Sequence, residues 1–413
     1  MRSSKRAFVV AGITFLVLIA AAAFRSTTSV LYMPIEMEFG WTRVTTSGAV
    51  GLNILIYGLT APFAAVLMGR FGAKRIGLAA LALIAGGTAL TTVMTQPWQL
   101  YLAWGLLVGV GTGCLALVFG AQVSNNWFIK RRGLITGIFS AGYATGQLLF
   151  LPAITNVAAT AGWRPATLIV TAFTIVLIPL FALLFKDRPG ERDNPYGGTH
   201  EDLPARPPVT IKANIDALAS AVRMPAFWAL ALTFFVCGWT TNGLIAAHFI
   251  PAAHDHGMPT TMAAGLLAVV GIFDFVGTIA SGWLTDRFNS AYLLVAYYGL
   301  RGLALFSVPF VLGPTVELPM WFFIVFYGLD WIATVPPTVE LCRRYFGLQN
   351  SPLIYGWVFA SHMVGAALAS AYAGWIRESQ GDYYIAWITA AVLCLAASAY
   401  ALTLRKPPSM EVK

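Results

Sequence analysis

Long apolar segments with almost no charge dominate this sequence of 413 residues and limit what it can fold into. Only 10% of its residues are charged, whereas a soluble domain carries about 25%. A helix needs roughly 20 apolar residues to cross a hydrocarbon core about 30 Å thick. Segments of this length occur at 7–31, 44–68, 76–95, 98–122, 134–158, 165–185, 226–250, 262–285, 292–312, 318–341, 351–374 and 383–404. They predict an all-α membrane protein with twelve transmembrane helices and the lipid bilayer as its solvent.

The polar stretch 186–222 divides these spans six and six. We therefore expect an N-terminal six-helix bundle at 1–185, a cytoplasmic linker at 186–222 and a C-terminal six-helix bundle at 223–413. The later part of this stretch, 210–223, is either a short helix on the membrane surface or a plain solvated segment.

Short matches relate the two halves at offsets of about 212 to 217 residues, as expected of a duplicated transporter unit. They pair Arg70 with Arg287, Arg131-Arg132 with Arg343-Arg344, and Gly162-Trp163 with Gly374-Trp375. The matches predict two pseudo-symmetric bundles.

The 26 Lys and Arg exceed the 17 Asp and Glu, which gives a formal net charge of +9. With the N-terminus inside, the outer loops hold only Arg43, Arg164 and Arg377 of these basic residues. This positive-inside pattern predicts a multi-pass plasma-membrane protein, which in a bacterium means the inner membrane, with both termini cytoplasmic. Because the charge follows the loops, we expect no nucleic-acid partner.

Motifs for metals, cofactors and catalysis are missing from the sequence. The four cysteines stand singly, and the histidines lack a convincing ligand spacing. No GxxxxGK[ST] loop for nucleotides occurs. No loop carries a nucleophile with its base. We expect no cofactor, no metal and no enzymatic activity.

Three charged residues lie near the middle of predicted spans: Asp274 in span eight, Arg301 in span nine and Asp330 in span ten. On insertion scales each costs about 2.5–3.5 kcal/mol at the bilayer centre, so such residues are functional candidates. Their similar depth allows pairing. Two interpretations stay open: a structural salt bridge, or a proton-coupling site in which one carboxylate titrates. Pro336-Pro337 predicts a kink beyond Asp330.

Arg25 lies in span one without an acid in the same span. A guanidinium there can bind a substrate carboxylate through two hydrogen bonds, or else extend toward the outer surface. Other polar side chains on the spans are candidates for substrate binding or for ordinary inter-helix hydrogen bonds. They are Asn53, Tyr57, Gln122, Tyr143, Gln147, Asn242, His248 and His362.

Two loops, GRFGAKR at 69–75 and GWLTDRFN at 282–289, resemble the gating-loop signature of the major facilitator superfamily. In that signature an acid precedes Arg and a basic pair follows. The first copy has Gly69 in place of the acid, and the second lacks the basic pair. The resemblance implies inter-helix charge pairing that stabilises an outward-open state; ordinary cytoplasmic charge is the alternative. The residues concerned are Arg70, Lys74, Arg75, Asp286 and Arg287.

The segments EFGWTR at 38–43 and NWFIKRRG at 126–133 resemble the superfamily branch that contains monocarboxylate transporters and oxalate/formate-type antiporters. This resemblance implies two six-helix bundles, and often a carboxylate substrate coupled to protons.

From these features we expect a secondary active transporter that moves a small organic anion, a monocarboxylate or aromatic acid, with protons. Arg25 would hold the anion, and Asp274, Arg301 and Asp330 would couple the proton. We expect it to act as a monomer. The main alternative is export or import of a larger amphipathic compound such as a drug, siderophore or lipopeptide.

Overall fold

The computed structural model describes residues 5–190, 193–199 and 210–405. Within the helices, side chains are described except at 25–27, 65, 117, 132–134, 136–137, 140–141, 143–145, 147–148 and 348–349. Nearly all of the described chain is helical, as expected where lipid offers the backbone no hydrogen-bond partners.

The first half of the chain forms five long helices, and one further span, Pro97–Trp127, is divided into four shorter segments. The elements are α1 (Lys5–Phe39), α2 (Arg43–Phe71), α3 (Ala73–Thr91), α4 (Pro97–Leu100), the π-helix η1 (Tyr101–Val108), α5 (Gly109–Cys114), α6 (Leu117–Trp127), α7 (Arg132–Ala161) and α8 (Trp163–Leu184).

The second half begins with a short helix, which was one of the two alternatives predicted for the segment 210–223. Its elements are α9 (Ile211–Ala221), α10 (Pro225–Gly238), the π-helix η2 (Trp239–Ile245), α11 (Ala246–Asp255), α12 (Thr260–Thr285), α13 (Ser290–Val311), α14 (Leu318–Asp330), α15 (Val335–Gln380), α16 (Tyr384–Ala401) and the 3₁₀ turn η3 (Leu402–Leu404).

Eleven helical segments of the described chain are long and apolar enough to cross a membrane. The remaining predicted span, 134–158, lies within α7, where the described residues give the shorter apolar helix Leu149–Ala161. The spans predicted from apolar runs are thus recovered as helices.

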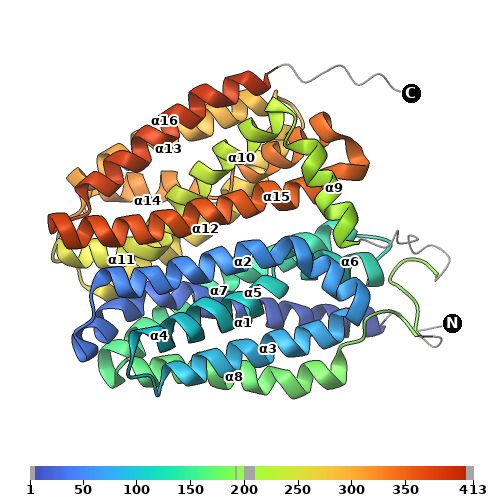
Figure 1. The fold of residues 1–413 in the computed structure, drawn as a ribbon, viewed down its shortest axis with the longest axis horizontal. Helices are drawn as coiled ribbons and strands as arrows, with labels where there is room; N and C mark the ends of the chain where they lie inside the picture. The colour runs from blue at the N-terminus through green and yellow to red at the C-terminus, as the bar shows by residue number, and fades with distance from the viewer. Residues whose placement is uncertain (1–4, 191–192, 200–209, 406–413) are drawn as a thin grey trace. The chain divides into compact units, whose positions relative to one another are not determined.

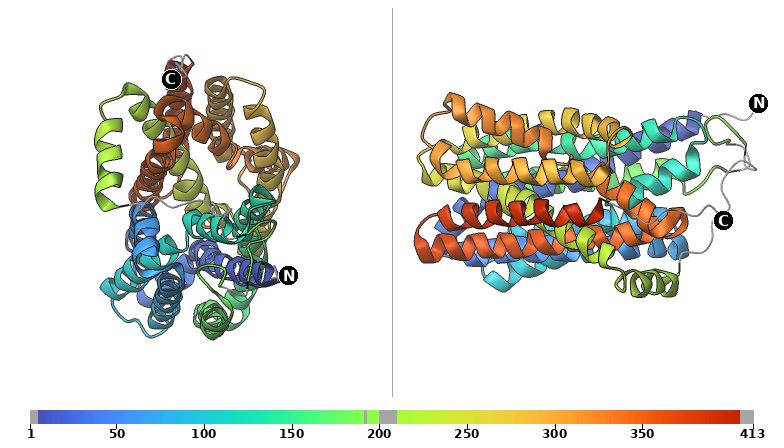
Figure 2. Two further views of the ribbon diagram at one scale, coloured as in Figure 1. Left: turned by 90° about the vertical axis from the view of Figure 1, so that its right-hand side faces the viewer. Right: turned by 90° about the horizontal axis from the view of Figure 1, so that it is seen from above.

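The chain divides into two compact units, residues 1–27 with 59–211 and residues 28–58 with 212–413. Within the first, α3 lies beside α8; within the second, α10 packs on α15 and α13 on α16 (Figure 1). In each unit the long helices run side by side along one direction (Figure 2). The end of α1 and the first half of α2 thus belong to the second unit, although the sequence groups them with the first bundle.

Span ten is interrupted at Asp330, earlier than the kink predicted at Pro336-Pro337. Helix α14 ends at Asp330, a turn follows, and α15 begins at Val335. Pro336 therefore lies in the first turn of a new helix, where its missing N–H costs nothing, instead of kinking a helix interior. The break directly follows the buried aspartate.

One of the three matches between the halves does not reflect equivalent structure. Gly162, at φ 93°, separates α7 from α8, and Trp163 starts the new helix. Gly374 and Trp375 lie instead inside α15, which continues to Gln380. This sequence match therefore pairs the start of one helix with the interior of another.

Candidate transport site

A buried ion pair joins α13 to the end of α14. The Arg301 side chain is fully buried, and its Nε donates to Oδ2 of Asp330 at 2.5 Å. Its Nη2 donates to the backbone carbonyl oxygens of Asp330 at 2.5 Å and of Trp331 at 3.2 Å. The pairing that equal depth allowed is therefore formed between Arg301 and Asp330. The same guanidinium binds carbonyls that lose their helical i+4 partners where α14 stops.

Asp274 lies at the same break but is not bonded to Arg301. Its Oδ1 accepts from the backbone N–H of Ile332 at 3.0 Å and from the Thr278 hydroxyl at 3.1 Å. Ser281, two turns further along α12, donates to the carbonyl of Ala333. Helix α12 thus uses its polar side chains to satisfy the broken backbone of 331–334.

The π-helix η2 borders this ion pair. Arg301 Nη1 donates to Cys237 Sγ at 3.1 Å and lies 3.4 Å from the Thr240 hydroxyl. The Tyr327 hydroxyl donates to the Thr240 carbonyl at 2.9 Å. Since π-helical turns are frequent at functional sites, η2 marks this part of the second unit as a candidate site.

Several predicted binding residues meet around Asn242 of η2. The Asn242 amide donates to His362 Nε2 at 3.1 Å. The Phe359 ring stacks on the His362 ring, with centroids 5.8 Å apart and planes 6° apart, and Tyr57 of α2 meets Phe359 edge-on at 6.2 Å. Phe234 adds a ring 4.7 Å from that of His362. We call these five residues the aromatic cluster. Phe359 and Phe234 were not among the predicted binding residues, since a phenylalanine in an apolar span carries no distinguishing signal.

Glycines bring the helices around this cluster into backbone contact. A Cβ added at Gly238 would collide with the carbonyl of His362, and one at Gly365 with the carbonyl of Phe235. A Cβ at Gly58 would collide with Met363. Small residues therefore set how closely α2, α10 and α15 approach in this unit.

Other predicted binding residues are placed less fully. Arg25 lies in α1, and Tyr143 and Gln147 in α7, but their side chains lie outside the described part. Asn53 is buried on α2, one turn before Tyr57, and Gln122 is half-buried on α6. Among these, Asn53 shares a helix face with a residue of the aromatic cluster.

His248 lies away from the aromatic cluster, at the predicted outer end of the second unit. Its Nε2 is 2.9 Å from the Ser370 carbonyl, and its Nδ1 is 3.2 Å from the Tyr383 hydroxyl. That hydroxyl also accepts from Arg43 Nη1 at 2.6 Å. Arg43 in turn binds both carboxylate oxygens of Glu36, at 2.7 and 2.9 Å. We call Glu36, Arg43, His248 and Tyr383 the outer cluster.

From its place in the sequence, Arg43 was expected to be an ordinary outer-loop charge. The signal for the outer cluster was present, because the segment 38–43 carries the family resemblance and Glu36 precedes it. Burial raises the pKa of the Tyr383 phenol, so this group stays protonated and able to donate. Tyr383 lay at the edge of a predicted span and had no pattern to mark it.

The loop residues predicted to form gating contacts lie at helix ends. Among the described residues, none of Arg70, Lys74, Arg75, Asp286 and Arg287 forms an ion pair. The backbone N–H of Lys74 donates to Asp187 at 2.7 Å, and Arg287 lies over the Trp283 ring, 3.9 Å from its centroid. The charge pairing implied by the loop signature remains a prediction for another state.

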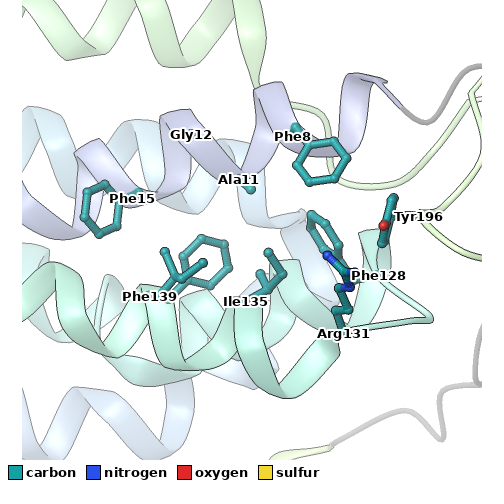
Figure 3. Close-up of a pocket in the computed structure, with 10 residues that line it drawn as sticks. Phe8, Ala11, Gly12, Phe15, Phe128, Arg131, Ile135, Phe139 and Tyr196 are labelled. Atoms are coloured by element: carbon teal, nitrogen blue, oxygen red, sulfur yellow. The ribbon is translucent and has the colours of Figure 1, made fainter.

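An apolar pocket of 310 Å³ lies between α1 and α7 in the first unit (Figure 3). Phe8, Phe15 and Phe139 contribute rings to its lining, and Arg131 lies at its edge. Apart from Arg131 and Tyr196, the lining residues have no polar side-chain atom. It therefore lacks the several convergent polar groups that a small anion needs.

Comparison with known proteins places the chain in a family. The Major Facilitator Superfamily model matches residues 13–349. Monocarboxylate transporter 13 of Bos taurus is 28% identical over 370 residues, which cover 88% of this chain and 80% of that protein. The uncharacterised MFS-type transporter YcxA of Bacillus subtilis (strain 168) is 23% identical over 414 residues, covering 97% of this chain and 95% of YcxA.

Solved structures agree on the fold. A D-xylose-proton symporter aligns with a TM-score of 0.72 at 12% identity, over 97% of this chain and 98% of the symporter. The chain therefore belongs to the major facilitator superfamily, as a multi-pass membrane protein and secondary transporter of a small-molecule substrate, not an enzyme, that is distantly related to the monocarboxylate transporters.

Proposed function

We propose that this transporter moves a small organic anion, a monocarboxylate or aromatic acid, together with protons. The observation that carries the proposal is the buried group of Asp274, Arg301 and Asp330 around the break between α14 and α15. Two of the three charges neutralise each other, and the third, on Asp274, has no cation bonded to it among the described residues. An uncompensated carboxylate at this depth is costly unless it takes up a proton.

Asp274 is the better candidate for the titrating group. Both of its hydrogen bonds end on Oδ1, so Oδ2 receives none from the described residues and can hold a proton. Asp330 accepts from Arg301 through Oδ2, and this cation favours the carboxylate form of Asp330. In this proposal Asp330 and Arg301 fix the broken helix, and Asp274 carries the proton.

For the anion we retain Arg25 as the proposed cation and add the aromatic cluster as the proposed contact for the substrate's apolar part. Aromatic rings that face each other edge-on or offset favour a further planar ring. The Asn242–His362 pair supplies polar groups beside those rings. The cluster therefore favours aromatic acids over short aliphatic ones.

Proton coupling supplies enough free energy for accumulation. One proton moving through 100 mV releases about 2.3 kcal/mol. At 1.4 kcal/mol per tenfold, this supports a gradient of roughly 45-fold. In the same proposal the chain is a monomer with both termini in the cytoplasm, and its bundles are 1–185 and 223–413.

The test is uptake by the purified protein in liposomes. A panel of labelled aromatic and aliphatic acids is measured with an acidic exterior, with equal pH and with a protonophore. We expect inward accumulation of an aromatic acid that the protonophore abolishes. If a fluorescent amphiphile is transported and no acid competes with it, the carboxylate assignment is wrong and the larger amphipathic substrate is favoured.

A ligand thermal-shift panel at two pH values provides an independent measurement, since a ligand of the folded state raises its melting temperature by mass action. Stabilisation by the transported acid should be greater at the lower pH if proton and anion bind together.

A further inference from the structure

We infer that the outer cluster is a latch that keeps the predicted outer side of the transporter closed. Its members come from helices that the sequence assigns to different bundles. Glu36 and Arg43 belong to α1 and α2, whereas His248 belongs to α11 and Tyr383 directly precedes α16. All four lie in the second compact unit.

The hydrogen bonds of the latch form one continuous chain with a fixed direction. Arg43 donates to the Tyr383 oxygen at 2.6 Å. The Ser370 carbonyl can only accept, so His248 Nε2 carries the hydrogen of that bond and Nδ1 of the neutral ring accepts. The Tyr383 hydroxyl must then donate to His248 Nδ1, at 3.2 Å. The direction of every hydrogen bond is therefore fixed, and removal of the Tyr383 hydroxyl interrupts the chain of bonds between Arg43 and His248.

Burial makes this chain of bonds more than a surface contact. The side chains of Arg43 and Glu36 are only 11% and 14% exposed, and His248 is fully buried. The guanidinium of Arg43 also lies 5.5 Å from the centroid of the Tyr32 ring. A bidentate, largely buried pair of this kind holds a defined geometry, unlike an exposed ion pair.

A second contact, between α2 and α15, lies next to the latch. The Ser370 hydroxyl donates to the carbonyl of Ser47 at 3.2 Å, and a Cβ added at Gly374 would collide with the Ser47 side chain. Ser47 is fully buried as a result. If α2 moves away from α15 at this end, Ser47 becomes accessible to solvent.

Alternating access requires the two bundles to separate on one side at a time. Bonds between Arg43 and Tyr383 and between Ser370 and Ser47 must break for the outer side to open. The latch therefore acts on the equilibrium between closed and open outer sides, and not on the chemistry of the substrate site.

The latch is tested by labelling a cysteine at position 47 from outside with a membrane-impermeant maleimide. The native Cys114, Cys237, Cys342 and Cys394 are buried, which limits background labelling. In the S47C parent we expect slow labelling. Adding Y383F, which removes one hydroxyl and leaves the Glu36–Arg43 pair intact, should speed labelling by at least about tenfold through a shift in population.

Two controls separate the latch from general loosening. Y384F removes the hydroxyl of the neighbouring, exposed tyrosine, and D255N breaks the Asp255–Arg377 ion pair at the same end of the unit. Neither should change the labelling rate of S47C by more than about twofold. Thermal unfolding of each detergent-purified variant verifies that it is folded, and R43Q repeats the test from the other side of the Arg43–Tyr383 bond.

The inference is overturned if folded S47C/Y383F and S47C/R43Q label at the parent's rate. It is also overturned if Y384F or D255N accelerates labelling as much as Y383F does, because the effect would then come from any local change at this end.

Discussion

Arg301 contacts Asp330 through two different atoms of that residue, the carboxylate Oδ2 and the backbone carbonyl oxygen, each at 2.5 Å. One guanidinium thus neutralises a buried charge and satisfies a helix end at the same point. This explains why the acid lies at the last residue of α14: the backbone there has carbonyls without helical partners, and Arg301 supplies donors for them. The pair and the helix break are one structural feature.

Replacing Arg301 by Ala should strongly destabilise the protein, because Asp330 is left as an unpaired buried carboxylate. Removing one partner of a buried pair costs about 3–5 kcal/mol. R301K keeps the charge but offers a single nitrogen in place of three, so it should fall between R301A and the native protein. Thermal unfolding in detergent measures the effect. R287Q, on an exposed arginine at a helix end, is the matched control and should leave the melting temperature nearly unchanged.

Replacing Asp274 by Asn should preserve the fold and abolish proton-driven accumulation. The amide oxygen of Asn can still accept from Ile332 N–H, so the broken backbone keeps its bond, but the side chain no longer titrates. Substrate counterflow between equal pH compartments should persist while uptake driven by a pH gradient is lost. D216N, on the exposed face of α9, is the control. Retention of gradient-driven uptake in D274N would move the proton site elsewhere.

Replacing Phe359 by Leu should selectively weaken aromatic substrates. Loss of a ring contact costs about 0.5–1.5 kcal/mol beyond buried area, or roughly a two- to tenfold weaker Kd. The affinity for a short aliphatic acid should stay the same, as measured by competition binding. F306L removes a ring from the exposed surface of α13 and should affect neither. An equal loss for both classes of acid would mean that Phe359 acts through the fold.

Replacing Gly238 by Ala should disrupt the contact between α10 and α15. The added Cβ meets the His362 carbonyl, which belongs to backbone and cannot rotate away. Overpacking typically costs about 1–3 kcal/mol. G271A is the matched control, since Gly271 is a buried glycine of α12 whose added Cβ would have no atom within 4 Å. The yield of monodisperse protein and its melting temperature distinguish the two, and equal behaviour would contradict the close approach.

Much of the fold could be predicted because the bilayer limits which backbone structures can cross it. Apolar runs of about 20 residues must be helices in lipid. The segment 318–341 shows the limit of that rule, because its hydropathy predicts one span whereas α14 ends inside it. Hydropathy is averaged over a window of many residues, so it does not reveal a turn of only four residues. The break was decided by donors on other helices, from Ser281 and Arg301, which satisfy its carbonyls.

The sequence by itself determined which groups are costly to bury: Asp274, Arg301 and Asp330 in mid-span and the polar residues around them. Tertiary structure decided the partners, pairing Arg301 with Asp330, directing Asp274 to a backbone N–H, and joining Arg43 to a tyrosine 340 residues away. The reason is physical. The cost of burying a charge depends on the residue and its depth, which can be read from the chain, whereas the compensating bond depends on which helices pack together.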